Sequence, residues 1–129
     1  NRTYIGTDGQ ISSALSIYNE SWAVFPNLNG IVVQDNYFAT DGGYAAYFGA
    51  LAGKLAPPLG LYAINMSVTG NIFGRDEQRY SGIWGAGIGF NTGGVGNVWS
   101  GNVWGPRGPY WVSGDPEEGA TLLDPGPTT

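Results

Sequence analysis

The chain has 129 residues and a formal net charge of −5, with 10 acidic and 5 basic side chains and no cysteine or histidine. Its length suits one domain, and the missing residue types exclude disulfides, thiolate or imidazole metal ligands, and a serine–histidine–acid site within this chain. The basic residues are scattered, so we expect no nucleic-acid and no membrane partner, and no motif indicates a cofactor or a metal, so we expect none.

The 23 glycines and 8 prolines indicate short strands joined by turns rather than helices. Apolar runs predict strands at residues 11–18, 30–38, 44–48, 65–73, 83–90 and 96–104, and a further short one at 110–112. We divide the chain into a strand-bearing domain at 1–114 and an irregular tail at 115–129, rich in acidic residues, proline and glycine. The segment 105–124 is expected to cover the C-terminal end of the domain.

Three of the predicted strands share a repeated pattern of an apolar run, an asparagine, one further residue and a large aromatic. The asparagines are Asn36, Asn71 and Asn102, which are 35 and 31 residues apart. A repeat of this length is typical of a solenoid in which each turn of the chain stacks on the one before. The pattern predicts an all-β fold, a right-handed parallel β-helix of about three coils. The alternative is three unrelated hairpin strands with asparagines in their turns.

The repeated asparagine suits a corner between two strands. It tolerates the left-handed backbone conformation better than other non-glycine residues. Its amide carries a donor and an acceptor, so equivalent asparagines can form a ladder at the strand spacing of about 4.8 Å. Residues two positions apart in a strand share a face, which predicts two inward stacks of side chains. These stacks are Phe38, Phe73 and Trp104, and beside them Val33, Val68 and Trp99.

At residues 96–104, 71–76, 35–38 and 42–44, the chain resembles the last coils of secreted, pectate-lyase-like right-handed β-helix repeat proteins. Such proteins occur in actinobacteria and in the tails of their phages. The resemblance spans roughly residues 8–105 and implies a β-helix fold and an extracellular location, secreted or on a virion surface. Those relatives carry an acidic turn where this chain has residues 105–108, Gly-Pro-Arg-Gly, and their groove residues lie in earlier coils. The resemblance therefore assigns no catalytic residue.

Carboxylates are the remaining candidates for catalysis. Asp35 and Asp41 lie six residues apart around one predicted corner, and Asp76 could lie one coil further on, where paired acids would suit glycoside cleavage. The alternative is that they form turns. Residues 75–79 interleave acidic and basic side chains, which we expect to neutralise one another on a solvated loop. The acidic side chains of the tail, Asp115 among them, are expected to be too mobile for a preorganised site.

Aromatic residues outside the predicted core suggest a different function. Four of them flank loops or strand ends: Tyr37, Tyr44, Tyr80 and Trp84. Flat rings on a rigid β surface suit stacking on sugar rings, with nearby polar groups bonding the hydroxyls. The alternative is that these rings only pack loops and cap the coils.

The sequence therefore predicts a module that binds polysaccharide or a cell-surface glycan and is not catalytic by itself. Two alternatives stay open: a portion of a polysaccharide lyase or glycoside hydrolase whose catalytic coils lie outside this chain, and a structural unit whose coils stack end to end. No cap is recognisable before residue 11, so we expect preceding coils or another protein chain to cover the N-terminal end.

Overall fold

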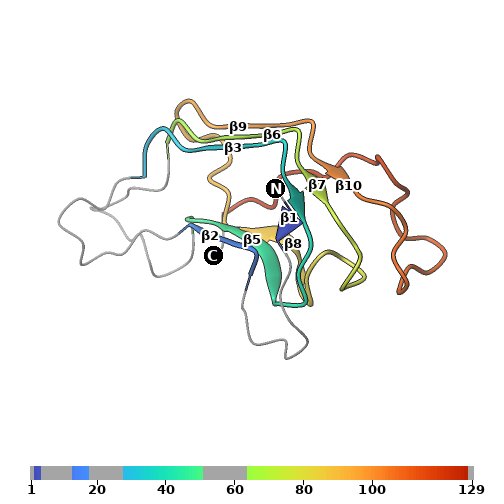
Figure 1. The fold of residues 1–129 in the computed structure, drawn as a ribbon. Coiled ribbons are helices and arrows are strands. Elements are labelled where there is room, and N and C mark those ends of the chain that lie inside the picture. Colours follow the sequence, from blue (N-terminus) through green and yellow to red (C-terminus); the bar gives the residue numbers. More distant parts are fainter. Residues whose placement is uncertain (1, 4–12, 18–27, 51–63, 128–129) are drawn as a thin grey trace.

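The computed structural model describes residues 2–3, 13–17, 28–50 and 64–127. These residues form ten short strands and no helix (Figure 1). The strands are β1 Arg2–Thr3, β2 Leu15–Ile17, β3 Val32–Gln34, β4 Tyr37–Phe38, β5 Tyr44–Phe48, β6 Ser67–Thr69, β7 Ile72–Phe73, β8 Gly85–Ile88, β9 Val98–Ser100 and β10 Val103–Trp104. Within this part of the chain there is no helix that could span a membrane.

All named strand pairs are parallel and fall into three sheets. We call them the first sheet (β3-β6-β9), the second sheet (β1-β4-β7-β10) and the third sheet (β2-β5-β8). The chain visits the sheets in the same order each time: β3, β4 and β5 form the first repeat, β6, β7 and β8 the second, and β9 and β10 the third. Figure 1 shows β3, β6 and β9 running side by side. The expected all-β, parallel arrangement is confirmed.

The register of the first and second sheets is the one that the repeat predicts. In the first sheet Val33 pairs with Val68 and Val68 with Trp99, at offsets of 35 and 31 residues. In the second sheet Phe38 pairs with Phe73 at the offset of 35, and Phe73 with Trp104 at the offset of 31. Equivalent residues of successive repeats are thus paired on neighbouring strands, because each repeat adds its strand to the sheet in the same register.

The second sheet reaches one strand further toward the N-terminus than the sequence pattern predicted. Arg2 pairs with Tyr37, again at an offset of 35 residues, so β1 precedes β4 as β4 precedes β7. A signal for this strand exists in the sequence: Asn1 stands before Arg2 as Asn36 stands before Tyr37. Asn1 itself lies outside the described residues.

The core lies between the three sheets. Its buried side chains come from all of them: Val33, Phe38, Ala45, Ala46, Phe48, Met66, Val68, Phe73, Ala86 and Phe90. The tilted rings of Phe38 and Phe73 pack with their centroids 5.1 Å apart. Trp99 packs edge-on against Phe48, at 5.3 Å between centroids. Trp99 and Trp104 are only half-buried, because within the described residues no further repeat follows theirs.

Several predicted strands are shorter than expected or missing. The strand predicted at 11–18 is β2, Leu15–Ile17, with residues 11, 12 and 18 outside the described part. The one predicted at 83–90 is β8, Gly85–Ile88. The prediction of a strand at 110–112 was wrong: this stretch is a turn, in which the Trp111 N–H donates to the carbonyl of Gly108 at 3.2 Å.

Candidate functional site

The three repeated asparagines form one hydrogen-bonded ladder at the corner between the first and second sheets. The backbone and amide nitrogens of Asn36 donate to Oδ1 of Asn71, at 3.0 and 3.1 Å. Those of Asn71 donate to Oδ1 of Asn102, at 3.0 and 2.9 Å. Asn71 Nδ2 also donates to the carbonyl of Val33, at 2.9 Å. Asn71 and Asn102 are fully buried, so these bonds satisfy groups that water cannot reach, and the role of the ladder is structural.

The physical reason for asparagine at this corner differs from the one expected. The residue in the left-handed conformation is the one before each asparagine: Asp35 at φ 55°, Gly70 at 67° and Gly101 at 67°. Glycine adopts this conformation freely and aspartate tolerates it. Asparagine is therefore used for its amide and not for its backbone.

A second row of asparagines, which the sequence reasoning did not assign, lies where the chain enters the first sheet. Asn65 Nδ2 donates to Asn29 Oδ1 at 2.9 Å, and Asn97 Oδ1 accepts from the Met66 N–H at 2.9 Å. The signal was present, because Asn65 follows Asn29 by 36 residues, close to the length of the repeat.

The three catalytic candidates lie at two different corners. Asp35 precedes β4, is exposed and accepts from Gln34 Nε2 at 3.3 Å. Asp41 and Asp76 follow β4 and β7 at equivalent positions, three residues after Phe38 and Phe73. Asp76 accepts a hydrogen bond from the Tyr37 hydroxyl, and Asp41 has one buried, unpartnered carboxylate oxygen. Among the described residues no cluster of three or more acidic side chains could hold a metal ion.

The expectation of a solvated, self-neutralising loop at residues 75–79 was wrong. Arg75 is only 1% exposed. Its guanidinium donates to the carbonyls of Gly105 at 2.6 Å, Pro106 at 3.3 Å and Pro116 at 2.5 Å. It also lies 5.5 Å from the ring of Trp104, a cation–π contact. The partners are 30 to 41 residues away in the chain, so local charge patterning could not identify them.

Asp115 is also held, contrary to the expectation for the tail. Arg79 Nε and Nη2 donate to the two carboxylate oxygens at 2.7 and 2.6 Å, and the Tyr80 hydroxyl donates at 3.2 Å. The side chain of Asp115 is 4% exposed. The hydrogen bonds from Arg79 hold the pKa of Asp115 well below its ordinary value; burial opposes this, and the N–H of Val112 and the hydroxyl of Tyr80 add to it. This fixes Tyr80 from its hydroxyl end.

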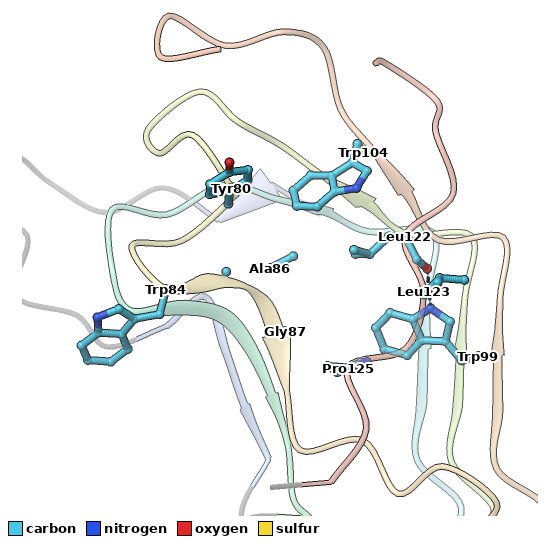
Figure 2. Close-up of a pocket in the computed structure, with 10 residues that line it drawn as sticks. Tyr80, Trp84, Ala86, Gly87, Trp99, Trp104, Leu122, Leu123 and Pro125 are labelled. Carbon is cyan, nitrogen blue, oxygen red and sulfur yellow. Dashed lines mark hydrogen bonds between the residues drawn. The ribbon is translucent and has the colours of Figure 1, made fainter. Parts of the chain in front are cut away.

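An aromatic pocket of about 250 Å³ lies against the outer edge of the third sheet (Figure 2). Its lining is Tyr80, Trp84, Gly85, Ala86, Gly87, Trp99, Trp104, Leu122, Leu123 and Pro125. Figure 2 shows Ala86 and Gly87 between Tyr80 and Trp104 on one side and Trp99 and Pro125 on the other. Trp84 lies at the outer rim with its ring directed away from Trp99. We call this cavity the aromatic pocket.

The aromatic pocket exists because the repeat is interrupted. β9 and β10 extend the first and second sheets, but after Gly105 the described chain gives the third sheet no further strand, so β8 stays at its edge. The C-terminal segment, residues 105–127, takes the place of that strand, and its residues 119–126 cross this end. The N–H of Leu122 donates to the carbonyl of Asn102 at 2.9 Å, and that of Phe90 to Gly126 at 3.0 Å. The pocket fills the space left beside β8.

One wall of the aromatic pocket comes from an extended connection between the second and third sheets. Phe38 pairs with Phe73 at an offset of 35 residues, whereas Ala46 pairs with Gly87 at an offset of 41. The second repeat therefore has six residues more than the first between these sheets. The longer connection carries Tyr80, and so brings a ring beside Trp104, at 6.3 Å between centroids.

The structure brings together three of the four aromatic candidates. Tyr80 and Trp84 line the aromatic pocket, and Tyr44 packs against Trp84 with ring centroids 5.8 Å apart. Tyr37 lies elsewhere, beside two cavities of about 180 and 310 Å³ next to the second sheet. The sequence reasoning missed Trp99 and Trp104 as lining residues because it assigned them to the core. Their position in the last repeat was the available signal, since a terminal repeat leaves its core stack covered on one side only.

Comparison with known proteins finds no match for this chain among protein families, curated proteins or solved structures. The function must therefore be argued from the geometry of the site.

Proposed function

We propose that this chain is a right-handed parallel β-helix module of an extracellular or virion-surface protein, and that it binds polysaccharide without being catalytic by itself. The proposed fold rests on the parallel register, with each of the first two repeats adding one strand to each sheet in the same order. The proposed function rests on one observation: aromatic rings gather around a cavity on a rigid sheet edge.

The size and the lining of the aromatic pocket suit a sugar ring. A volume of about 250 Å³ is at the small end of ligand sites, so it suits one residue of a glycan. Tyr80 and Trp104 offer ring surfaces for the C–H face of a pyranose. The indole Nε1–H of Trp104 has no hydrogen-bond partner in the described part of the chain, whereas that of Trp99 donates to the Leu122 carbonyl at 2.8 Å. Trp104 therefore supplies a donor for a sugar oxygen.

The site is also preorganised. Arg79 and Asp115 hold the hydroxyl end of Tyr80, and the cation–π contact with Arg75 holds Trp104. Binding then costs little side-chain entropy, which favours affinity from a small contact area. A backbone contact at this end argues against the alternative of a purely structural unit whose coils stack end to end. The N–H of Trp104 at this end of the second sheet already donates to the carbonyl of Ala120, at 3.0 Å.

The proposal is tested by binding of the chain to immobilised polysaccharides and by the change in its tryptophan fluorescence during titration with oligosaccharides. We expect binding that Tyr80→Ala weakens about tenfold, equivalent to about 1.4 kcal/mol, and that Tyr80→Phe largely retains because the ring remains. Tyr110→Ala is the matched control, since Tyr110 is an exposed aromatic outside the pocket. Absence of binding to a broad panel, or an equal loss with the control, would contradict the proposal.

A further inference from the structure

We infer that the aromatic pocket selects an uncharged sugar residue and rejects uronic acid and sulfated sugars. This inference rests on the proposed function and adds the class of glycan. None of the ten lining residues carries a charge at neutral pH: they are aromatic, aliphatic, glycine or proline. An acidic sugar placed here would lose hydration of its carboxylate or sulfate without gaining a cationic partner, which is unfavourable.

The nearby arginines cannot supply that partner. Every guanidinium nitrogen of Arg75 donates to a backbone carbonyl. Arg79 makes a two-pronged ion pair with Asp115. Arg107 makes the same kind of pair with Glu117, at 2.9 and 2.7 Å, and its guanidinium lies 3.9 Å from the ring centroid of Trp111. The three arginine side chains that the structure describes are thus committed to contacts within the protein.

Charges of both signs stand behind the lining rings, and the positive ones belong to arginines already committed to other contacts. The Arg79 guanidinium lies 4.7 Å from the ring centroid of Tyr80, and that of Arg75 lies 5.5 Å from the ring centroid of Trp104. Asp115 accepts the hydroxyl of Tyr80, so a carboxylate stands directly behind one wall. Asp124 lies between the lining residues Leu123 and Pro125 and accepts from the Thr92 hydroxyl at 2.6 Å and the Gly126 N–H at 3.1 Å. Because Asp115 is paired with Arg79, repulsion of an anionic glycan comes mainly from the net charge of −5.

The experiment compares neutral polysaccharides with acidic ones, and an acidic polysaccharide with its carboxyl-reduced form. Galactan, xylan, glucan and mannan are the neutral probes, and polygalacturonate, alginate and their carboxyl-reduced derivatives complete the set. We expect binding to at least one neutral or carboxyl-reduced probe at least tenfold tighter than to any acidic one, with little dependence on salt. Tighter binding of an acidic probe would overturn the inference while leaving the proposed function intact. Failure of every probe to bind would overturn the proposed function itself.

A charged side chain introduced into the lining tests whether the aromatic pocket is the site that selects uncharged over acidic sugars. Leu123 is 77% exposed, so Leu123→Arg should fold normally and place a free cation at the pocket rim. We expect this variant to bind polygalacturonate at least tenfold more tightly than the unaltered chain. Val95→Arg is the matched control, because Val95 is 75% exposed and outside the pocket. An equal gain in both variants would show a nonspecific charge effect and overturn the assignment of selectivity to this pocket.

Discussion

Of the two connections that join the second sheet to its neighbours, one keeps the same length in every repeat and the other does not. The corner between the first and second sheets has two residues in every repeat: Asp35–Asn36, Gly70–Asn71 and Gly101–Asn102. The connection between the second and third sheets has five residues in the first repeat, 39–43, and eleven in the second, 74–84, and no third-sheet strand follows β10 in the described chain. The constant corner carries the ladder, and the variable connection carries one wall of the aromatic pocket.

The two connections differ in how well they tolerate a change of length, and a functional site can form where the length can change. At the constant corner Asn71 is bonded to its equivalents on both sides, Asn36 and Asn102, so an insertion in one repeat would break bonds in its neighbours as well. At the variable connection several polar groups have partners of their own, such as Gly105 and Asp115, that the C-terminal segment provides, whereas the buried Ser81 Oγ has no hydrogen-bond partner among the described residues. A connection with its own partners can change length without disturbing the sheets. The following predictions test this difference.

The largest effect is expected at the constant corner. Asn71→Leu removes the acceptor for Asn36 and the donors to Asn102 and to the Val33 carbonyl. With two or more buried groups left unsatisfied at about 1–3 kcal/mol each, we expect a loss of about 3–5 kcal/mol in the free energy of unfolding. Urea denaturation measures it. Asn36→Leu, at the half-buried end of the described ladder, should cost less; an equal cost would argue against the ladder as the stabilising unit.

A smaller loss is expected where Arg75 joins the variable connection to the C-terminal segment. Arg75→Met keeps much of the side-chain volume but leaves the Gly105 and Pro116 carbonyls without their donor. We expect a loss of about 1–3 kcal/mol in unfolding free energy. Arg107→Met is the control: its ion pair with Glu117 is exposed, so it should cost at most about 1 kcal/mol. Losses in the reverse order would show that burial of Arg75 contributes nothing.

As the pH falls, the variable connection should lose stabilising contacts before the asparagine ladder does. The pKa of Asp115 is lowered in the folded state, chiefly by Arg79, so its contribution to stability is complete above its ordinary pKa of 3.8 and is lost as the pH falls through the lower folded value. The melting temperature should therefore decrease as the pH falls below about 4. Asp115→Asn should lower the melting temperature at pH 7 and flatten this acid dependence. If the melting temperature of the variant still decreased with falling pH as that of the unaltered chain does, Asp115 would be excluded as the cause of the decrease.

The smallest effect on stability is expected at the pocket rim. Trp84 is 68% exposed, and its main ring contact is Tyr44, so Trp84→Ala should change the free energy of unfolding by about 1 kcal/mol or less. Glycan binding should nevertheless weaken, because the rim loses a ring. Thermal melting and oligosaccharide titration of the same sample separate the two effects. A large loss of stability would place Trp84 among the structural residues instead.

The sequence by itself determined the parts of this protein that recur. Asparagines and aromatics at offsets of 35 and 31 residues predicted the register of two sheets, because stacking of equivalent strands requires equivalent side chains at the same places. The sequence also predicted the β5 strand at its observed bounds, Tyr44–Phe48.

Only the tertiary structure decided the parts that occur once. Arg75 is buried because carbonyls of the C-terminal segment surround it, and Asp115 is held because Arg79 reaches it across 36 residues. The aromatic pocket likewise depends on the absence, within the described residues, of a third-sheet strand beside β8 after β10. A repeated contact leaves a periodic signal in the sequence, whereas a contact made once between distant segments leaves none, since its energy depends on where the fold places both partners.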